Sequence, residues 1–145
     1  MNDIITQDLI ALDVALADKA AVIGQIADLL QAAGRLKDRQ RYIDDVYERE
    51  AMVPTGIGNL IAIPHARSAG VGESGLVFVR LAAPIAWNED EQARLVFGIA
   101  VPDDNADNLH LKILANVAKK LLDDKIKQLI EESQSKQEIL EALLA

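Results

Sequence analysis

The chain has 145 residues, of which half are hydrophobic but only 3% aromatic, with two histidines, no cysteine and a net charge of −8. This length fits a single domain, residues 1–145, whose core is built from aliphatic side chains. The acidic balance argues against a nucleic-acid-binding face, and the lack of cysteine excludes disulfides and thiolate chemistry within the chain.

The beginning of the sequence and its hydropathy indicate a cytoplasmic protein. Residues 1–6 lack the basic and apolar regions of a signal peptide. Apolar runs stay shorter than the ~18 residues that a membrane-spanning helix needs. We therefore expect no direct insertion into a membrane.

The first third predicts a short strand at residues 9–12 and then two amphipathic helices. Residues 18–33 place apolar side chains at helical spacing, with Asp18 as the N-cap and Gly34 as the left-handed residue after the last turn. Residues 39–51 predict the second helix, which Pro54 and Gly56 end.

Three strands are expected in the middle of the chain, at residues 60–63, 76–81 and 95–101. The third run is almost continuously apolar, which is typical of a strand covered on both faces. Pro84 and Trp87 predict a break after the second strand.

The C-terminal third predicts three helices, at residues 109–122, 126–132 and 136–144. Asn108 or Asp107 is the expected N-cap of the first, and Ser135 with Glu138 matches a capping box at the last. Helices, then strands, then helices again indicate an α/β fold around one sheet.

His65 is the first candidate for chemistry, because Pro64 is expected to end the strand just before it. The histidine would then lie at a strand end, a common position for ligands in α/β sheets. A neutral imidazole nitrogen has a free lone pair and can attack phosphorus without a helper base. The alternative is a structural histidine held by hydrogen bonds.

His110 is the second candidate, in the first turn of the helix predicted at residues 109–122. Free backbone N–H groups and the positive end of the helix dipole attract anions there and disfavour the imidazolium. A neutral His110 could help to hold a phosphoryl group on His65. The alternative is a partly buried structural histidine.

Arginines supply the candidate phosphate ligands, since a guanidinium can grip two phosphate oxygens at once. Arg49 lies at the end of the second helix and is the first choice; Arg67 and Arg80 are weaker candidates. The alternative for Arg49 is a surface arginine paired with a nearby carboxylate, from Asp45, Glu48 or Glu50.

Other common chemistries find little support. Gly56 and Gly58 do not form a dinucleotide fingerprint, since the third glycine is missing and a strand follows. There is no Walker A sequence, and the histidines with Asp103 and Asp104 lack the spacing of helix-borne zinc sites. We expect neither a metal nor a cofactor.

The motif at residues 49–66, Arg-Glu-x-x-x-Pro-Thr-Gly-Ile-Gly-Asn-Leu-Ile-Ala-Ile-Pro-His-Ala, resembles the signature of the fructose/mannitol type of enzyme IIA. This is the type 2 phosphocarrier domain of the bacterial sugar phosphotransferase system. Residues 108–114, with His110, resemble the family's second histidine element. The resemblance covers essentially the whole chain, although Ala66 stands where many relatives have glycine.

The resemblance implies a mixed β-sheet flanked by helices on both faces. It implies that His65 accepts a phosphoryl group from the phosphocarrier protein HPr and passes it to a cysteine of a IIB component, which serves a membrane IIC permease. His110 and Arg49 match the residues that steady the phosphoryl group. We also expect His65 in a shallow depression, within an apolar patch that has a polar rim.

A regulatory role is the alternative within the same family. The nitrogen-related branch has a very similar motif before its histidine, and its members act by binding other proteins according to their phosphorylation state. The sequence does not separate the two roles, and it does not name a sugar.

Overall fold

The structure is a computed structural model that describes residues 4–104 and 109–144, without the side chains of residues 109 and 110. Five α-helices and a short 3₁₀ helix lie in this part of the chain: η1 Gln7–Leu9, α1 Lys19–Ala32, α2 Arg39–Met52, α3 Leu109–Leu121, α4 Asp124–Glu132 and α5 Lys136–Leu144. Six strands form one sheet: β1 Ile10–Val14, β2 Gly56–Gly58, β3 Ile61–Ala62, β4 His65–Ser68, β5 Gly75–Ala86 and β6 Gln92–Pro102.

The sheet is mixed, as the resemblance implied, and β6 is its organising strand. The order is β1-β5-β6-β3-β2, and β4 also pairs with β6. The long strands β5 and β6 are antiparallel, whereas β3 and β4 both run parallel to β6. Two short strands that follow each other along one side of β6 thus carry the chain past Pro64 to His65.

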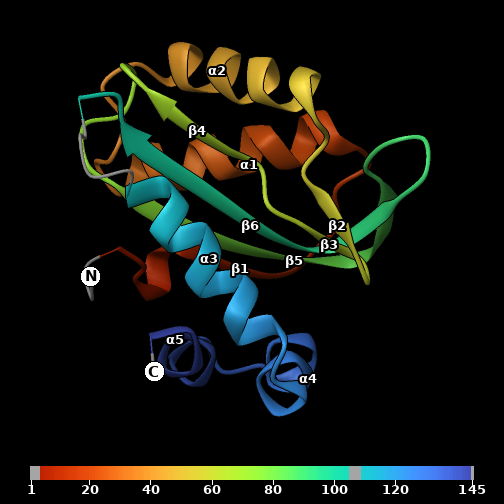
Figure 1. Ribbon diagram of the computed structural model, residues 1–145. Coiled ribbons are helices and arrows are strands. Elements are labelled where there is room, and N and C mark those ends of the chain that lie inside the picture. Colours follow the sequence, from red (N-terminus) through yellow and green to blue (C-terminus); the bar gives the residue numbers. More distant parts are fainter. Residues whose placement is uncertain (1–3, 105–108, 145) are drawn as a thin grey trace.

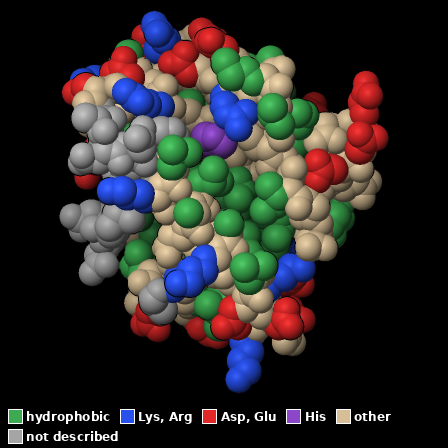
Figure 2. All heavy atoms as spheres, in the orientation of Figure 1, with side chains coloured by type: hydrophobic (Ala, Val, Ile, Leu, Met, Phe, Trp, Pro, Cys, Tyr) green, Lys and Arg blue, Asp and Glu red, His purple; other side chains and the backbone are tan. Residues whose placement is uncertain are grey.

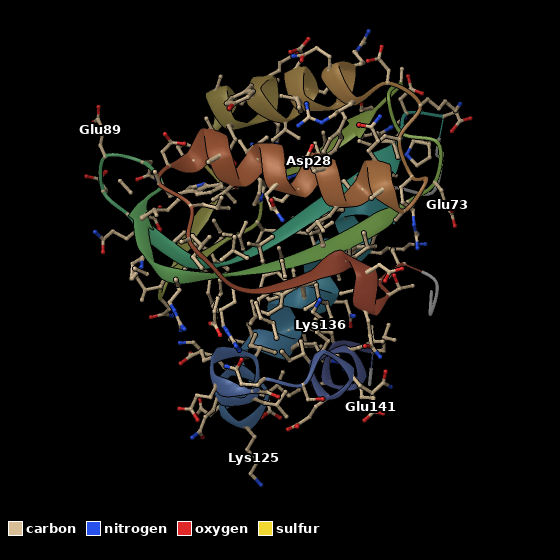
Figure 3. All side chains as sticks on the ribbon, turned by 180° about the vertical axis from the view of Figure 1, so that it is seen from behind. Asp28, Glu73, Glu89, Lys125, Lys136 and Glu141 are labelled. Atoms are coloured by element: carbon tan, nitrogen blue, oxygen red, sulfur yellow. The ribbon has the colours of Figure 1, made fainter. Side chains whose placement is uncertain are left out.

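Helices cover both faces of the sheet (Figure 1). Helices α1 and α2 pack on one face, where α1 contacts β5 and α2 contacts β4; α3 packs on the other face against β6. Figure 3, seen from behind, shows α1 lying across the sheet. Helices α4 and α5 lie beyond α3, at the end of the molecule away from α2 (Figure 1).

Capping residues set the ends of the first two helices. The Asp18 carboxylate accepts a hydrogen bond from the backbone N–H of Ala21 at 2.8 Å, and Gly34 has a φ of 75° after α1. Asp38 caps α2 in the same way, through the N–H of Arg41 at 3.1 Å. The predicted helix boundaries here are within one residue of the observed ones.

The core is aliphatic apart from a few aromatic rings, as the composition indicated. Phe78 on β5 and Phe97 on β6 stack with ring centroids 4.9 Å apart. Gly98 lets α1 approach the sheet, because a Cβ there would lie 2.6 Å from a methyl carbon of Ile26. Both hydrophobic faces of β6 are consequently buried, which explains its continuous apolar sequence.

Several strand predictions need correction. The run predicted at residues 60–63 forms only the two-residue β3, and the glycine turn before it includes β2, which pairs with β3 as a hairpin. Strand β5 continues through Pro84 instead of ending before it. The proline lies where the register with β6 shifts, between Arg80 and Ile85, so its missing N–H costs no regular ladder hydrogen bond.

The C-terminal helices follow the prediction. Helix α3 ends at Leu121, α4 begins two residues earlier than expected, and α5 has the expected bounds. The N–H of Glu138 donates to the Ser135 hydroxyl at 3.1 Å, which is half of the predicted capping box. In the described part of the chain, no helix is long and apolar enough to cross a membrane.

Candidate functional site

Pro64 separates two strands and so decides where His65 lies. The chain pairs with β6 through Ile61 and Ala62, and it resumes pairing at His65, opposite Ile99. The N–H of Ile99 donates to the Pro64 carbonyl at 3.0 Å, so β6 keeps its partner across the interruption. The sequence predicted that His65 lies just after the end of a strand. In the structure His65 is instead the first residue of a new strand, β4.

The ring of His65 is held by a hydrogen bond within its own segment. Its Nδ1 atom lies 2.8 Å from the carbonyl oxygen of Ile63. A carbonyl only accepts, so Nδ1 must carry the proton. The neutral ring is thereby fixed in the tautomer that leaves a lone pair on Nε2.

Burial favours the neutral form of this ring. His65 is 7% exposed, more enclosed than the sequence suggested. Burial lowers the pKa of the imidazole below its usual range, against the hydrogen bond to Ile63, which raises it. The positive charge of Arg49 lowers the pKa further, and the negative charge of Glu50 raises it. The net shift is downward, so the ring is uncharged at neutral pH.

His65 lines a surface depression with a volume of about 340 Å³. Besides Ala66 and Ala69, the other lining residues come mainly from one face of α2 and from the ends of β4 and β6: Arg41, Asp45, Glu48, Arg49, Met52, Arg67 and Asp103. Figure 2 shows the histidine (purple) near blue basic side chains on this face of the molecule. Although the whole chain is acidic, the lining contains three arginines and three acidic residues.

Two of these arginines, Arg49 and Arg67, bind backbone carbonyls, so their positive charges can attract an anion. Arg49 donates from Nη1 to the Val53 carbonyl at 3.0 Å, and Arg67 donates from Nε and Nη2 to the Asp103 carbonyl at 3.1 and 2.9 Å. Among the described residues, neither forms an ion pair with a carboxylate. A carbonyl uses part of a guanidinium's five donors but does not cancel its charge.

Arg41 is a site residue that the sequence reasoning missed. It donates from Nε to Asp45 at 3.1 Å and lines the depression with it. Positions 41, 45 and 49 are spaced by four residues and so share one helix face. Once Arg49 was the first candidate, this spacing could have identified Arg41 from the sequence as a residue on the same face of the helix.

The sequence made Arg80 a weaker candidate for binding phosphate, and the structure rules this out because Arg80 lies in the interior, away from the depression. It is fully buried on β5, where it donates to both carboxylate oxygens of Asp13 at 2.9 and 3.1 Å. Its Nη1 atom also donates to the carbonyls of Ile130 and Ser133 at 3.1 and 2.8 Å. Arg80 joins the sheet to the C-terminal helices, and it is not among the residues that line the depression.

His110 is the second residue of α3 by its backbone, but its side chain lies outside the described residues. The expected N-caps Asp107 and Asn108 also lie outside them. Within the described residues, no group of three or more His, Cys, Asp or Glu side chains could hold a metal ion.

Large apolar side chains are exposed in the segment that leads from the end of α2 towards His65. Met52 lines the depression itself, whereas Leu60 lines a second depression together with Arg94 and Lys127. Met52 and Val53 are 70% and 60% exposed at the end of α2, and Ile57 and Leu60 are 53% and 40% exposed around the β2–β3 hairpin. Figure 2 shows green hydrophobic side chains gathered beside the histidine. An apolar patch bordered by arginines is a suitable surface for transient protein docking.

Comparison with protein families gives a match over residues 3–145 to the family described as "Phosphoenolpyruvate-dependent sugar phosphotransferase system, EIIA 2". A fructose-specific EIIA component of Haloferax volcanii is 34% identical over 94% of this chain and 89% of its own length. A fructose-specific EIIABC component of Bacillus subtilis is 32% identical over 99% of this chain. The chain spans 23% of that relative and 21% of a mannosylglycerate-specific EIIABC component of Escherichia coli.

Solved structures give the same picture. The nitrogen regulatory protein IIA-Ntr of Neisseria meningitidis has a TM-score of 0.82 and 27% identity, covering 98% of this chain and 97% of its own. The mannitol IIA of Escherichia coli has a TM-score of 0.80 and 27% identity, covering 96% and 98%. The complex of the mannitol IIA with phosphorylated IIB gives a TM-score of 0.82 and 26% identity, covering 97% of this chain and 96% of the matched one.

Proposed function

Because this chain belongs to the EIIA type 2 family of the phosphoenolpyruvate-dependent sugar phosphotransferase system, we propose that it is a phosphocarrier whose acceptor atom is Nε2 of His65. The observation that carries this proposal is the hydrogen bond from Nδ1 to the Ile63 carbonyl. It leaves the other ring nitrogen with a lone pair beside two arginines that have no carboxylate partner among the described residues.

In the proposed reaction, phospho-HPr is the donor. The Nε2 lone pair forms a bond to phosphorus while the bond between phosphorus and the donor's imidazole nitrogen breaks, and that electron pair returns to the donor ring. Nδ1 keeps its proton, so the phosphorylated ring becomes positively charged. The Ile63 carbonyl, 2.8 Å from Nδ1, stabilises this charge.

Phosphoryl transfer depends on positioning and on stabilising charge on the three equatorial oxygens. Arg49 supplies this charge in our proposal, and Arg67, whose guanidinium is held by the Asp103 carbonyl, adds to it. His110 steadies the phosphoryl group from the start of α3. In the second half-reaction, a thiolate of the IIB component attacks phosphorus and the His65 ring leaves as a neutral imidazole.

The IIB component is proposed as the acceptor because the chain is similar to a IIA solved in complex with phosphorylated IIB. Sugar transport is favoured over regulation by the 34% identity to a fructose-specific EIIA component. The regulatory alternative has its own support, since IIA-Ntr is as similar in sequence to this chain as the mannitol IIA is, at 27%.

The test is incubation with phosphoenolpyruvate, enzyme I and HPr, followed by mass spectrometry and then by addition of candidate IIB components. We expect one phosphoryl group on the native chain, none on the His65→Ala variant, and transfer to a IIB cysteine. Labelling of His65→Ala would reject the acceptor assignment. Labelling only by a nitrogen-branch HPr homologue, with no transfer to any IIB, would favour the regulatory role.

A further inference from the structure

We propose that Glu50 is a positioning residue for His65, acting through the side chain and backbone of Thr55 and the backbone of Ile63. The proposal rests on the proposed function only in taking His65 as the phosphoryl acceptor. Glu50 itself does not line the depression, and it is not among the residues that the phosphoryl group would contact.

Glu50 is a buried carboxylate with three donors. It is 6% exposed, two residues before the end of α2. Its Oε2 atom accepts from Lys19 Nζ at 2.7 Å and from the Thr55 backbone N–H at 3.2 Å. Its Oε1 atom accepts from the Thr55 hydroxyl. The carboxylate thus joins the start of α1, the end of α2 and the segment before β2.

From Thr55 the hydrogen bonds continue directly to the reactive ring. The Ile63 N–H donates to the Thr55 carbonyl at 3.0 Å, and the Ile63 carbonyl accepts from Nδ1 of His65 at 2.8 Å. All three residues are buried, with exposures of 6%, 2% and 7% for Thr55, Ile63 and His65. No solvent surrounds these bonds to replace them if one is broken.

Through this series of hydrogen bonds, Glu50 can influence which nitrogen of the His65 ring carries the proton, although Glu50 does not line the depression. Ile63 donates through its backbone N–H to Thr55 and accepts at its carbonyl oxygen from the His65 ring, so the placement of Ile63 sets the position and the orientation of that ring. The placement of Ile63 depends on Thr55, and Thr55 is held at two points by Glu50.

A carboxylate suits this place better than its amide would. Lys19, the Thr55 N–H and the Thr55 hydroxyl are all donors towards Glu50. An amide would aim its own N–H groups at one of them and would leave one donor unpaired. Lys19 is itself fixed, because its Nζ atom lies 5.0 Å from the centroid of the Trp87 ring.

The test compares Glu50→Gln and Thr55→Val with Glu141→Gln, which removes an acidic charge on α5, far from His65 (Figure 3). Thr55→Val removes one donor while keeping the Glu50 charge and the Thr55 backbone. Nitrogen-resolved NMR of the His65 ring at neutral pH reports which nitrogen carries the proton. The rate of phosphorylation by phospho-HPr is measured on the same samples.

We expect Glu50→Gln to lose the preference for the Nδ1–H tautomer and to be phosphorylated roughly tenfold more slowly or worse, because small displacements of a reacting group are costly. Thr55→Val should change both readouts in the same direction by less, and Glu141→Gln should change neither. A folded Glu50→Gln with the native tautomer and the native rate would overturn the proposal.

Two further outcomes are also decisive. If Glu50→Gln does not fold, Thr55→Val decides with the same two readouts, and native values for both overturn the proposal. If native protein is never phosphorylated on His65, the proposed function fails, but the tautomer comparison still decides whether Glu50 positions the ring. A purely structural role for Glu50 would lower stability without moving the tautomer.

Discussion

The Nδ1 atom of His65 lies 2.8 Å from the carbonyl oxygen of Ile63, a residue only two positions earlier in the chain. Pro64 lies between them, with a fixed φ and no N–H of its own. The ring is therefore anchored by its own segment, and one nitrogen stays available on the side of the depression. In the proposed reaction, the attacking Nε2 atom therefore carries no proton that must first be removed.

The first prediction concerns the pH range in which His65 reacts. Burial lowers the pKa of the ring, with Arg49 adding to the effect. The NMR titration midpoint of His65 should lie below about 6.5, the value of an unperturbed imidazole. Phosphorylation by phospho-HPr should be independent of pH above that range and fall as the ring becomes protonated. A midpoint above 6.5 would contradict the assigned environment.

The same pKa shift predicts a pH dependence of stability. The folded state binds this proton less readily than the unfolded state, so the free energy of unfolding falls as pH decreases through about 6.5 towards the lower folded-state pKa. The His65→Gln variant has no imidazole at this position, so this contribution to the fall in the free energy of unfolding should be absent. Urea unfolding measures the free energy of unfolding of both proteins at pH 7.5 and at pH 5. The native chain should lose more stability than His65→Gln between these two pH values. A difference that does not change with pH speaks against the shift.

Arg49 should contribute to transfer through its charge and its donor geometry. We expect Arg49→Ala to slow phosphorylation about 100-fold, and Arg49→Lys to recover part of the loss, since an ammonium keeps the charge but not the paired donors. Lys136→Ala on α5, at the far end of the molecule (Figure 3), is the matched control. Equal rates for Arg49→Ala and the control would remove Arg49 from the mechanism.

Arg80 should matter for stability and not for phosphoryl transfer. Arg80→Met removes the donor to the carbonyls of Ile130 and Ser133. It also removes both hydrogen bonds from Arg80 to the Asp13 carboxylate, which keeps Gln134 and Arg94 as partners. We expect the free energy of unfolding to fall by about 3 kcal/mol. Under conditions where the variant is folded, its phosphorylation rate should equal that of the native chain. A slow but fully folded variant would place Arg80 in the site after all.

Leu60 should show a conflict between stability and docking. Asn59 and Leu60 both have positive φ, 56° and 64°, at the tip of the β2–β3 hairpin, and Leu60 is 40% exposed. A left-handed leucine is strained, so Leu60→Gly should raise the free energy of unfolding by about 1 kcal/mol. Loss of the apolar side chain should at the same time weaken transfer to IIB. Chemical denaturation and transfer kinetics measure the two effects, and Asn59→Gly provides the control at the tip.

Long-range contacts account for what the sequence could not predict. The first two helices were predicted to within one residue because their signals, such as the Asp18 cap and the apolar spacing, are local in the sequence. The interruption of the strand at Pro64 was also a local signal, but the resumption of pairing at His65 depends on Ile99, which is distant in sequence. Arg80 has the same guanidinium as Arg49, and only its partners in the folded chain separate their roles: Asp13 on the neighbouring strand β1 and the carbonyls of Ile130 and Ser133.

The sequence pointed to two residues that line the depression, but not to the buried contacts behind them. The motif and the scarcity of histidine led to His65, and the end of α2 led to Arg49. The roles of Glu50 and Thr55 arise from a carboxylate, a hydroxyl and two peptides that meet only in the folded chain. A sequence does not display which buried carboxylate has its donors already in place.

The most direct measurement of the central claim is the identity of the phosphorylated atom. After phosphorylation by phospho-HPr of protein labelled with ¹⁵N in histidine, NMR coupling between phosphorus and nitrogen locates the new bond. We expect the coupling at Nε2 of His65, with the proton retained on Nδ1. Phosphorus on Nδ1 of His65, or on His110, would contradict the account.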